Sequence, residues 1–358
     1  MRRLLCAALC LILVSGVALA EKTILLTFTG DCTLGGEEST RSWETSFDSV
    51  AAAKGWGCFF SAFTEMFAAD DATIVNLEGV LADSTDGAKG IKNFRFRGDP
   101  AYVAMLKNAS VEVASLANNH AMDYGEEGLQ STVNALKSAG IRWIRRGAYI
   151  VLKKDGVRVA LFGVDADGFR EEGKFLCSEI SRVKFEDEVD AVIAVCHTGK
   201  EHVPKHYAVQ ANTATALIDA GADLVIMHHP HVVQGVAVYN GATICYSLGN
   251  FVFGGNTRIQ SKTYYRNHPA TNLYGLVVQA ELHFTDEGKY IGQQVFLYPI
   301  LTSGDLQTND YQPRLAISED AREVLECVQF DTAFTLPDYD EDTGCVTLPF
   351  VEALPDAD

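Results

Sequence analysis

Residues 224–231 read Leu-Val-Ile-Met-His-His-Pro-His, a short apolar run that ends abruptly in a group of histidines. A run of this length without a polar face predicts a strand that is buried on both sides, as in a sheet of the α/β kind. The histidines that follow can bind metal ions or move protons near neutral pH. The polar ending therefore marks a candidate functional site at the carboxyl end of a buried strand.

The same pattern, an apolar run followed directly by polar side chains, occurs at six places in the chain. The polar endings are Gly30-Asp31, Asn76-Leu77-Glu78, Asn118-Asn119-His120 with Asp123 beyond it, His197, His228-His229-Pro230-His231, and Ser247-Leu248-Gly249-Asn250. Because the carboxyl ends of parallel strands share one edge of an open sheet, these distant residues are expected to meet in one site. A single histidine after a strand would say little, but six such endings are not explained by packing alone.

Segments with helical periodicity separate several of these runs. Apolar residues recur at three- and four-residue steps in 59–69, 101–107, 125–139 and 207–220. Strands alternating with helices predict an α/β fold around a buried sheet. Beyond residue 270 we expect a hairpin formed by 273–284 and 290–299, then a helix over 318–330. This predicts a main domain over 21–300 and a C-terminal extension over 301–358, with the hairpin and the helix as a C-terminal appendage and an acidic end from Pro337 onward that is loosely held.

The first twenty residues have the features of a secretory signal peptide. Arg2 and Arg3 precede an apolar run from Leu4 to Val17, and small residues stand at the end of the segment in Ala18-Leu19-Ala20. The apolar run is too short to span a bilayer comfortably, although a retained N-terminal anchor is the alternative. We therefore predict a secreted or cell-envelope protein.

Charge and cysteine content narrow the possible partners. The 358 residues include 29 basic and 47 acidic side chains, a formal charge of −18, which becomes −20 if the N-terminal segment with its two arginines is removed. A chain this acidic repels phosphate backbones, so we expect no nucleic-acid partner.

Seven cysteines remain after residue 20. Because seven is odd, at least one thiol is unpaired or joins two chains.

Six of the polar side chains form a plausible ligand set for metal ions. They are Asp31, Glu78, Asn119, His197, His229 and His231. Six donors exceed what one zinc ion takes, so we predict two divalent ions, and the oxygen and imidazole donors suit Mn, Fe or Zn. Such a pair activates water and stabilises both oxygens of an in-line displacement. His229 and His231 are expected to alternate on an extended segment around Pro230.

His120 and Asp123 are candidates for proton transfer at this site. His120 adjoins Asn119 and would act as the general acid for the leaving group, oriented by Asp123. The alternative is that Asn118 and Asp123 only cap the helix that begins near Gly125. His228 is expected to pack or hydrogen-bond rather than to bind metal. Strand alternation also points Cys196 away from His197 and into the core.

As a set, these motifs resemble the CapA family of poly-γ-glutamate capsule biosynthesis proteins, which is related to the calcineurin-like metallophosphatases. The resemblance covers about Thr23 to Phe253 and rests on the endings quoted above together with His197-Thr198-Gly199-Lys200-Glu201. It implies a four-layer α/β/β/α sandwich, metallophosphatase-like, with a metal site at the sheet edge of an extracytoplasmic protein. It also implies that Asp31, Asn119, His197, His229 and His231 bind the ions, with Glu78 beside Asn76 in place of the bridging acid.

Two positions depart from the metallophosphatase pattern. Thr33 stands where a histidine usually follows the first aspartate, and Asn76-Leu77-Glu78 replaces Gly-Asp. One ion is therefore expected to be weak, exchangeable or absent.

A basic patch within the acidic chain suggests how substrate is held. In Lys92-Asn-Phe-Arg95-Phe-Arg97, alternate spacing puts Arg95 and Arg97 on one face of an extended segment. Arginine binds carboxylate and phosphate groups through two bonds, so we assign both to substrate binding with Asn76 and Asn250. The alternative is ion pairing with local acids.

Three functions compete at this stage. The first is poly-γ-glutamate capsule biosynthesis or processing, the second a metal-dependent phosphoesterase or γ-glutamyl polymer hydrolase, and the third a non-catalytic factor that binds a polyanion during assembly. The substrate in each case is an anionic polymer or a phosphoester, and capsule synthase membrane proteins are candidate partners.

Overall fold

The computed structural model describes residues 22–88, 92–186, 189–259, 263–265, 268–305 and 308–354. The predicted signal peptide at 1–20 lies outside this part of the chain and stays a prediction. Within the described residues, no helix is both long and apolar enough to cross a membrane.

Two large sheets form the centre of the molecule. The first has the order β18 (Arg314–Leu315), β17 (Tyr290–Leu301), β16 (Tyr274–Phe284), β1 (Lys22–Thr33), β2 (Ala72–Leu77), β5 (Val113–Ser115) and β6 (Arg142–Ile144), with β13 (Asn250–Phe253) beside β1 and β19 (Val346–Thr347) and β20 (Val351–Glu352) beside β17. The second has the order β11 (Val236–Tyr239), β12 (Ala242–Cys245), β10 (Leu224–His228), β9 (Ala191–His197), β8 (Val157–Asp165) and β7 (Tyr149–Lys154). Two short pairs, β3 (Val80–Leu81) with β4 (Arg97–Gly98) and β14 (Thr263–Tyr265) with β15 (His268–Ala270), lie apart from them.

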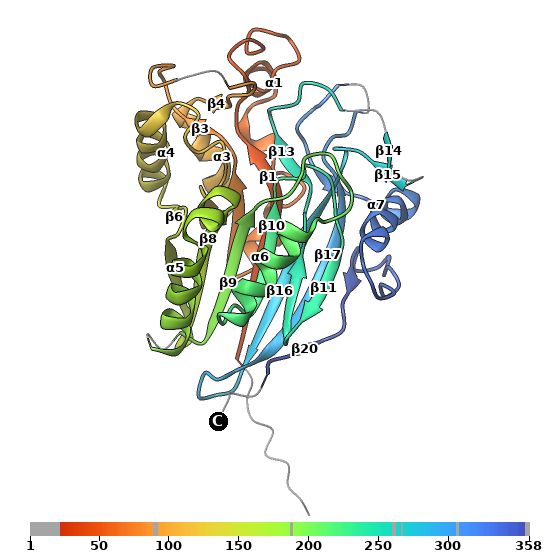
Figure 1. Cartoon of the computed structure of the whole chain (residues 1–358). Coiled ribbons are helices and arrows are strands. Elements are labelled where there is room, and N and C mark those ends of the chain that lie inside the picture. Colours follow the sequence, from red (N-terminus) through yellow and green to blue (C-terminus); the bar gives the residue numbers. More distant parts are fainter. Residues whose placement is uncertain are drawn as a thin grey trace, which may run out of the picture.

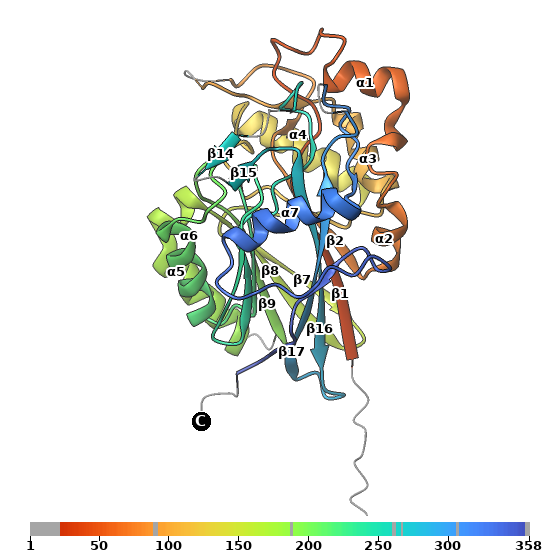
Figure 2. The ribbon, with the colours of Figure 1, turned by 90° about the vertical axis from the view of Figure 1, so that its right-hand side faces the viewer.

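Helices cover the outer face of each sheet. The first sheet is covered by α1 (Phe47–Lys54), α2 (Thr64–Ala69), α3 (Val103–Asn108) and α4 (Gly125–Ala139), together with the short 3-10 helices η1 (Trp56–Cys58) and η2 (Pro100–Tyr102). The second is covered by α5 (Ala166–Phe185) and α6 (Ala208–Asp219). Figure 2 shows this arrangement, with α5 and α6 on one side of the two sheets and α2 and α3 on the other. The predicted four-layer α/β/β/α sandwich is confirmed.

The continuous apolar runs exist because each strand is buried on two faces. On β10, Leu224 and Ile226 point into the core between the sheets, whereas Val225 and Met227 pack under the helices of the second sheet. Since side chains alternate along a strand, only a run without polar positions satisfies both faces.

The parallel strands bring their carboxyl ends to one edge of each sheet. β1 runs parallel to β2 and β13, and β9 runs parallel to β8 and β10. The register places Asp31 beside Asn76 and Asn250, and His228 beside His197. His228 also joins the two sheets, because its Nε2 lies 2.9 Å from the carbonyl oxygen of Thr29. The expectation that His228 hydrogen-bonds is confirmed.

The C-terminal hairpin and helix form where the sequence predicted them, and they belong to the body of the fold. β16 pairs with β1 from Lys22 to Phe28, and β17 completes the hairpin. Helix α7 (Ser318–Phe330) packs against the core between the sheets and lies beside β17 in Figure 1. The domain boundary at residue 300 stays a prediction.

The expectation of a loosely held end is wrong for 337–354. β19 and β20 pair with β17, and Val346 and Leu348 are buried. The long outer edge of β17 supplies hydrogen-bond partners, and the few apolar side chains of this acidic segment turn inward.

All seven cysteines after residue 20 lie among the described residues, and no disulfide joins any two of them. Cys196 packs under the helices of the second sheet, away from His197, as strand alternation predicted.

Candidate metal centre

The site lies where the carboxyl ends of the parallel strands of one sheet face those of the other sheet. Asp31 comes from β1 of the first sheet, and His197 ends β9 of the second. Glu78 directly follows β2, and its backbone is held by two hydrogen bonds to the end of β1. Its N–H donates to the carbonyl oxygen of Cys32 at 2.8 Å, and its own carbonyl oxygen accepts from the Thr33 hydroxyl at 2.7 Å.

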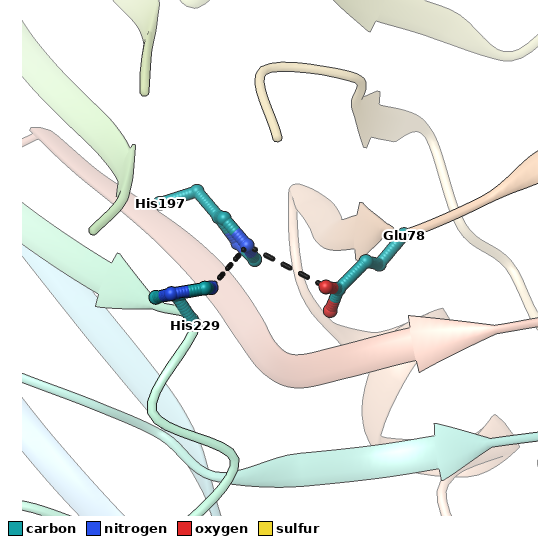
Figure 3. A group of neighbouring side chains, drawn as sticks. All are labelled: Glu78, His197 and His229. Carbon is teal, nitrogen blue, oxygen red and sulfur yellow. Dashed lines mark hydrogen bonds and ion pairs between the residues drawn. The ribbon is translucent and has the colours of Figure 1, made fainter. Parts of the chain in front are cut away.

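The Glu78 carboxylate is the centre of the cluster. Its Oε1 lies 3.5 Å from Nε2 of His197, 3.7 Å from Nε2 of His120 and 3.8 Å from Nε2 of His231. The side chain is fully buried, and neither oxygen has a hydrogen-bond partner among the described residues. Burial, with the negative charge of Asp31, raises the pKa of Glu78 well above its ordinary value. Figure 3 shows Glu78 facing His197 and His229 from the opposite sheet.

Asp31 and His231 form a buried pair beside Glu78. Nδ1 of His231 lies 3.1 Å from Oδ2 of Asp31, and Asn76 donates to Oδ1 of Asp31 at 2.8 Å. Burial alone would raise the pKa of Asp31, but the His231 hydrogen bond and the nearby imidazole charges hold it below its ordinary value. Burial alone would lower the pKa of His231, but Glu78 and Asp31 raise it to about 10. A cation is thus stabilised between these two carboxylates.

The second group of donors is formed by His197, His229 and Asn119. Nε2 of His197 lies 2.8 Å from Oδ1 of Asn119 and 3.1 Å from Nδ1 of His229. Burial lowers the pKa of His197 well below its ordinary value and that of His229 to about 4. Both rings are therefore neutral at pH 7, the form in which imidazole binds a metal ion.

The backbone around Pro230 differs from the predicted extended segment. His229 and His231 have φ angles of 100° and 57°, in the left-handed region. The two rings reach the site because the chain turns there, and not because they alternate along a strand. The expectation of an extended His-Pro-His segment is wrong.

His120 and Asp123 form a pair next to the donors. Nδ1 of His120 lies 2.7 Å from Oδ2 of Asp123, and the ring stacks on Phe96 at a centroid distance of 4.4 Å. Oδ2 of Asp123 also accepts the Phe96 N–H at 2.7 Å. Burial lowers the pKa of His120, against the opposing effect of Asp123.

The helix-capping alternative for Asp123 and Asn118 does not describe these contacts. Helix α4 begins without a side-chain cap. Asn118 donates to Oδ1 of Asn76 at 3.1 Å and accepts the His120 N–H at 3.1 Å, so it braces the loop that carries His120.

The proposed substrate-binding residues are placed differently from one another. Arg97 is 8% exposed, and its guanidinium binds Glu38 at 2.6 Å and the Ala82 carbonyl oxygen at 2.7 Å, so the ion-pair alternative holds for its side chain. Arg95 is half-buried and lines a cavity of about 330 Å³ with Lys92. Oδ1 of Asn250 lies 2.9 Å from Nδ1 of His231. Asn76 contacts Asp31 and His197, so both asparagines adjoin the metal-binding candidates. A substrate role for all four remains a prediction.

Two residues at the site were missed in the sequence. Lys92 forms an ion pair with Asp123 and donates to the carbonyl oxygen of Asn119 at 2.8 Å. The carboxylate of Glu201 lies within 4.8 Å of ring nitrogens of His229 and His231. The available signals were the basic patch, which contains Lys92, and the short spacing of Glu201 after His197.

The residues present fit a divalent cation. Three groups of side chains bring their donor atoms within 4.8 Å of one another: Asp31 with Glu78 and His231, Glu78 with His197 and His229, and Glu201 with His229 and His231. Glu78 is shared by two groups, and its buried oxygens accept no hydrogen bond from the described residues. Mixed carboxylate and imidazole donors suit a divalent ion such as Mn, Fe or Zn.

The fold and this cluster define a class, the four-layer α/β/β/α proteins with a candidate metal centre at the carboxyl ends of their strands. Residues 25–255 match the family described as "Bacterial capsule synthesis protein PGA_cap", and the chain belongs to this family. The resemblance to the CapA family is thereby confirmed.

Two relatives and one solved structure illustrate the similarity. "Capsule biosynthesis protein CapA" of Bacillus anthracis is 33% identical over 54% of this chain and 53% of its own length. "PGA biosynthesis protein CapA" of Bacillus subtilis is 30% identical over 64% of this chain and 65% of its own length. The chain thus matches less than two thirds of either relative. A hypothetical protein from Thermus thermophilus has a TM-score of 0.43 at 15% identity, over 77% of this chain and 99% of that one.

Proposed function

We propose that this protein acts in the synthesis or processing of a poly-γ-glutamate capsule, outside the cytoplasm, as a metal-dependent hydrolase or transferase of an anionic polymer. The observation that carries the proposal is the fully buried Glu78 carboxylate, which has no hydrogen-bond partner among the described residues and faces His197, His120 and His231. A buried carboxylate that accepts no hydrogen bond is costly, and a bound cation would remove that cost. The family match supports the link to a capsule.

In this proposal the protein's own residues divide the work. Asp31, Glu78, Asn119 and the histidines 197, 229 and 231 hold the ion or ions. When bound, divalent ions act as Lewis acids towards an acyl or phosphoryl group. In its protonated form His120 would donate the Nε2 proton to the leaving nitrogen or oxygen, while Asp123 accepts from Nδ1 and favours the protonated ring. Lys92 keeps Asp123 and the Asn119 carbonyl in place.

Lys92 and Arg95 line one cavity and would be the cations that hold an anionic substrate. The cavity lining also includes Glu37 and Glu38. Because the whole chain carries a strong negative charge, local cations must overcome repulsion of a polyanion. Binding of the polymer is therefore expected to weaken with added salt or with a chelator.

A non-catalytic role is the second candidate, and the same cavity favours it. A site that only holds a polyglutamate chain needs cations but no proton donor. His120→Ala should then leave polymer binding unchanged, whereas Arg95→Ala should abolish it. Capsule synthase membrane proteins are the partners that either role would need, and attachment to or release from the cell envelope follows from the predicted signal peptide.

Metal content combined with turnover tests the proposal. Protein purified without chelator should contain a transition metal and hydrolyse γ-glutamyl polymers or phosphoesters. His120→Ala should lower turnover about 10²-fold or more while retaining the metal. His283→Ala is the matched control, because His283 lies at the opposite end of β16 from the site. A protein without metal and without metal-stimulated hydrolysis would refute the catalytic proposal.

A further inference from the structure

Glu201 occupies the solvent side of the candidate metal centre. It lies in the turn that follows β9, and its side chain is exposed, whereas His231 is buried and His229 half-buried. One of its carboxylate oxygens lies within 4.8 Å of a ring nitrogen of both histidines. This carboxylate therefore faces the two rings from outside, while Asp31 and Glu78 approach the centre from within.

The turn that carries Glu201 is fixed to the strand ends on both sides. Before it, the Thr198 N–H donates to the carbonyl oxygen of His228 at 3.0 Å. After it, the His202 N–H donates to the carbonyl oxygen of Pro230 at 2.8 Å. The backbone is thus held against the segment that bears the histidines, and the remaining freedom of Glu201 is in its side chain.

The far end of the same loop is held by the C-terminal part of the chain. Oδ2 of Asp331 accepts the His206 N–H at 2.9 Å, and Oδ1 lies 2.9 Å from Nδ1 of the same ring. Asp331 also accepts the Gly235 N–H at 3.1 Å. Asp331, which lies outside the family match at 25–255, therefore helps to hold this loop in place.

The buried donors leave room for another ligand. Asp31, Glu78 and His231 form one group of three donors, while His229 and His231 supply only two donor atoms to the group that contains Glu201; Zn, Mn and Fe take four or more. The exposed Glu201 carboxylate, on a fixed backbone, can supply a further donor beside the two histidines and can also swing away.

We propose that Glu201 is an exchangeable ligand of the metal centre, bound in the absence of substrate and displaced by the carboxylate or phosphate group of an anionic substrate. The proposal rests on the proposed function, since it needs the metal centre. It follows from chemistry: Glu201 and the substrate group carry the same charge and compete for the same open positions. Glu201 would then favour groups that bind the ions more strongly than a single side-chain carboxylate does.

Titration calorimetry with Mn²⁺, and then with inorganic phosphate on the Mn²⁺-loaded protein, tests this role without measuring turnover. Glu201→Gln should bind the same number of ions about tenfold more weakly, as expected for loss of one contributor to a metal site. The same variant should bind phosphate about tenfold more tightly, because the competing carboxylate is gone. Glu65→Gln is the matched control, since it removes the same charge from an exposed position on α2 and should change neither affinity.

Glu201→Asp separates ligation from simple charge. It keeps the negative charge but shortens the side chain by one methylene, so it should behave like Glu201→Gln. If the wild-type protein binds metal and both variants bind Mn²⁺ and phosphate as the wild-type protein does, the ligand role of Glu201 is refuted and the metal centre still stands. If only Glu201→Asp keeps the wild-type affinities, Glu201 acts through its charge and not as a ligand. A wild-type protein that binds no Mn²⁺ or other transition metal would overturn the metal centre and this inference together.

Discussion

Replacing Glu78 by methionine should stabilise the metal-free protein and abolish its response to metal. Glu78 is fully buried, with two oxygens that lack hydrogen-bond partners among the described residues. A buried polar group without a partner costs about 1–3 kcal/mol, and a charged one costs more. Methionine has a similar length and needs no partner, and His231 keeps its contact with Asp31 at 3.1 Å.

The expected gain for Glu78→Met without metal is about 1–3 kcal/mol. For a chain of this size, each 1 kcal/mol corresponds to a rise of about 1.3 °C in Tm, so the shift is about 1–4 °C. With metal bound, the wild-type protein should be more stable than Glu78→Met. The wild-type protein gains about 2.7 kcal/mol when the free metal is at 100 times its Kd, and the variant, which lacks the shared ligand, gains little.

Differential scanning calorimetry with EDTA and with Mn²⁺ measures both effects. Glu65→Met, at an exposed position on α2, is the control and should follow the wild-type protein in both conditions. If Glu78→Met melts below the wild-type protein in EDTA, the buried carboxylate is not a cost in the metal-free state. If Mn²⁺ raises its Tm as much as that of the wild-type protein, Glu78 is not the shared ligand. Either result refutes the reasoning.

Three further predictions concern stability. Burial raises the pKa of Asp70 to about 6. Its ionisation therefore destabilises the folded state progressively as the pH rises from about 4 to about 6. After allowance for the partial exposure of the side chain, Asp70→Asn should gain about 1 kcal/mol of unfolding free energy at pH 7 and nothing at pH 3, as measured by urea unfolding. A Cβ at Gly30 would lie 2.4 Å from a backbone carbonyl oxygen, whereas one at Gly57 would meet nothing within 4 Å. Gly30→Ala should therefore lower the free energy of unfolding by about 3 kcal/mol and weaken metal binding. A Tm equal to that of Gly57→Ala would contradict this. Lys92→Met should cost about 1–3 kcal/mol by removing the cation that pairs with the buried Asp123, and a double-mutant cycle should show that this cost disappears in Asp123→Asn.

Much of the fold could be predicted from local patterns. Helices α4 and α7 have the predicted bounds, and β8, β9 and β10 lie where continuous apolar runs stand. Such runs are informative because a strand buried on two faces cannot carry polar side chains. Helix α5 was missed, since it is rich in charged residues and contains two glycines. Its apolar side chains Leu176, Ile180 and Val183 pack on the second sheet, and this tertiary contact outweighs the weak local signal.

The candidate site could be predicted only in part. The polar residues at the strand ends come together as the topology rule implies, and the six proposed donors form one connected cluster. The rule says nothing about loops, so it missed Glu201 and gave no role to Lys92. It also could not foresee the left-handed turn at His229 and His231. That turn depends on contacts with residues distant in sequence, such as the His229 N–H donating to Asp31 at 3.3 Å.

The sequence by itself determined which segments are buried strands and which chemical groups stand at their ends, because both depend on neighbouring residues and on strand alternation. Only the tertiary structure decided that two sheets face each other, so that Asp31 and Glu78 from one meet His197, His229 and His231 from the other. The physical reason is that this meeting depends on contacts between residues far apart in the chain. The core between the sheets sets their separation, and no local pattern encodes the distance between the carboxylates of one sheet and the imidazoles of the other.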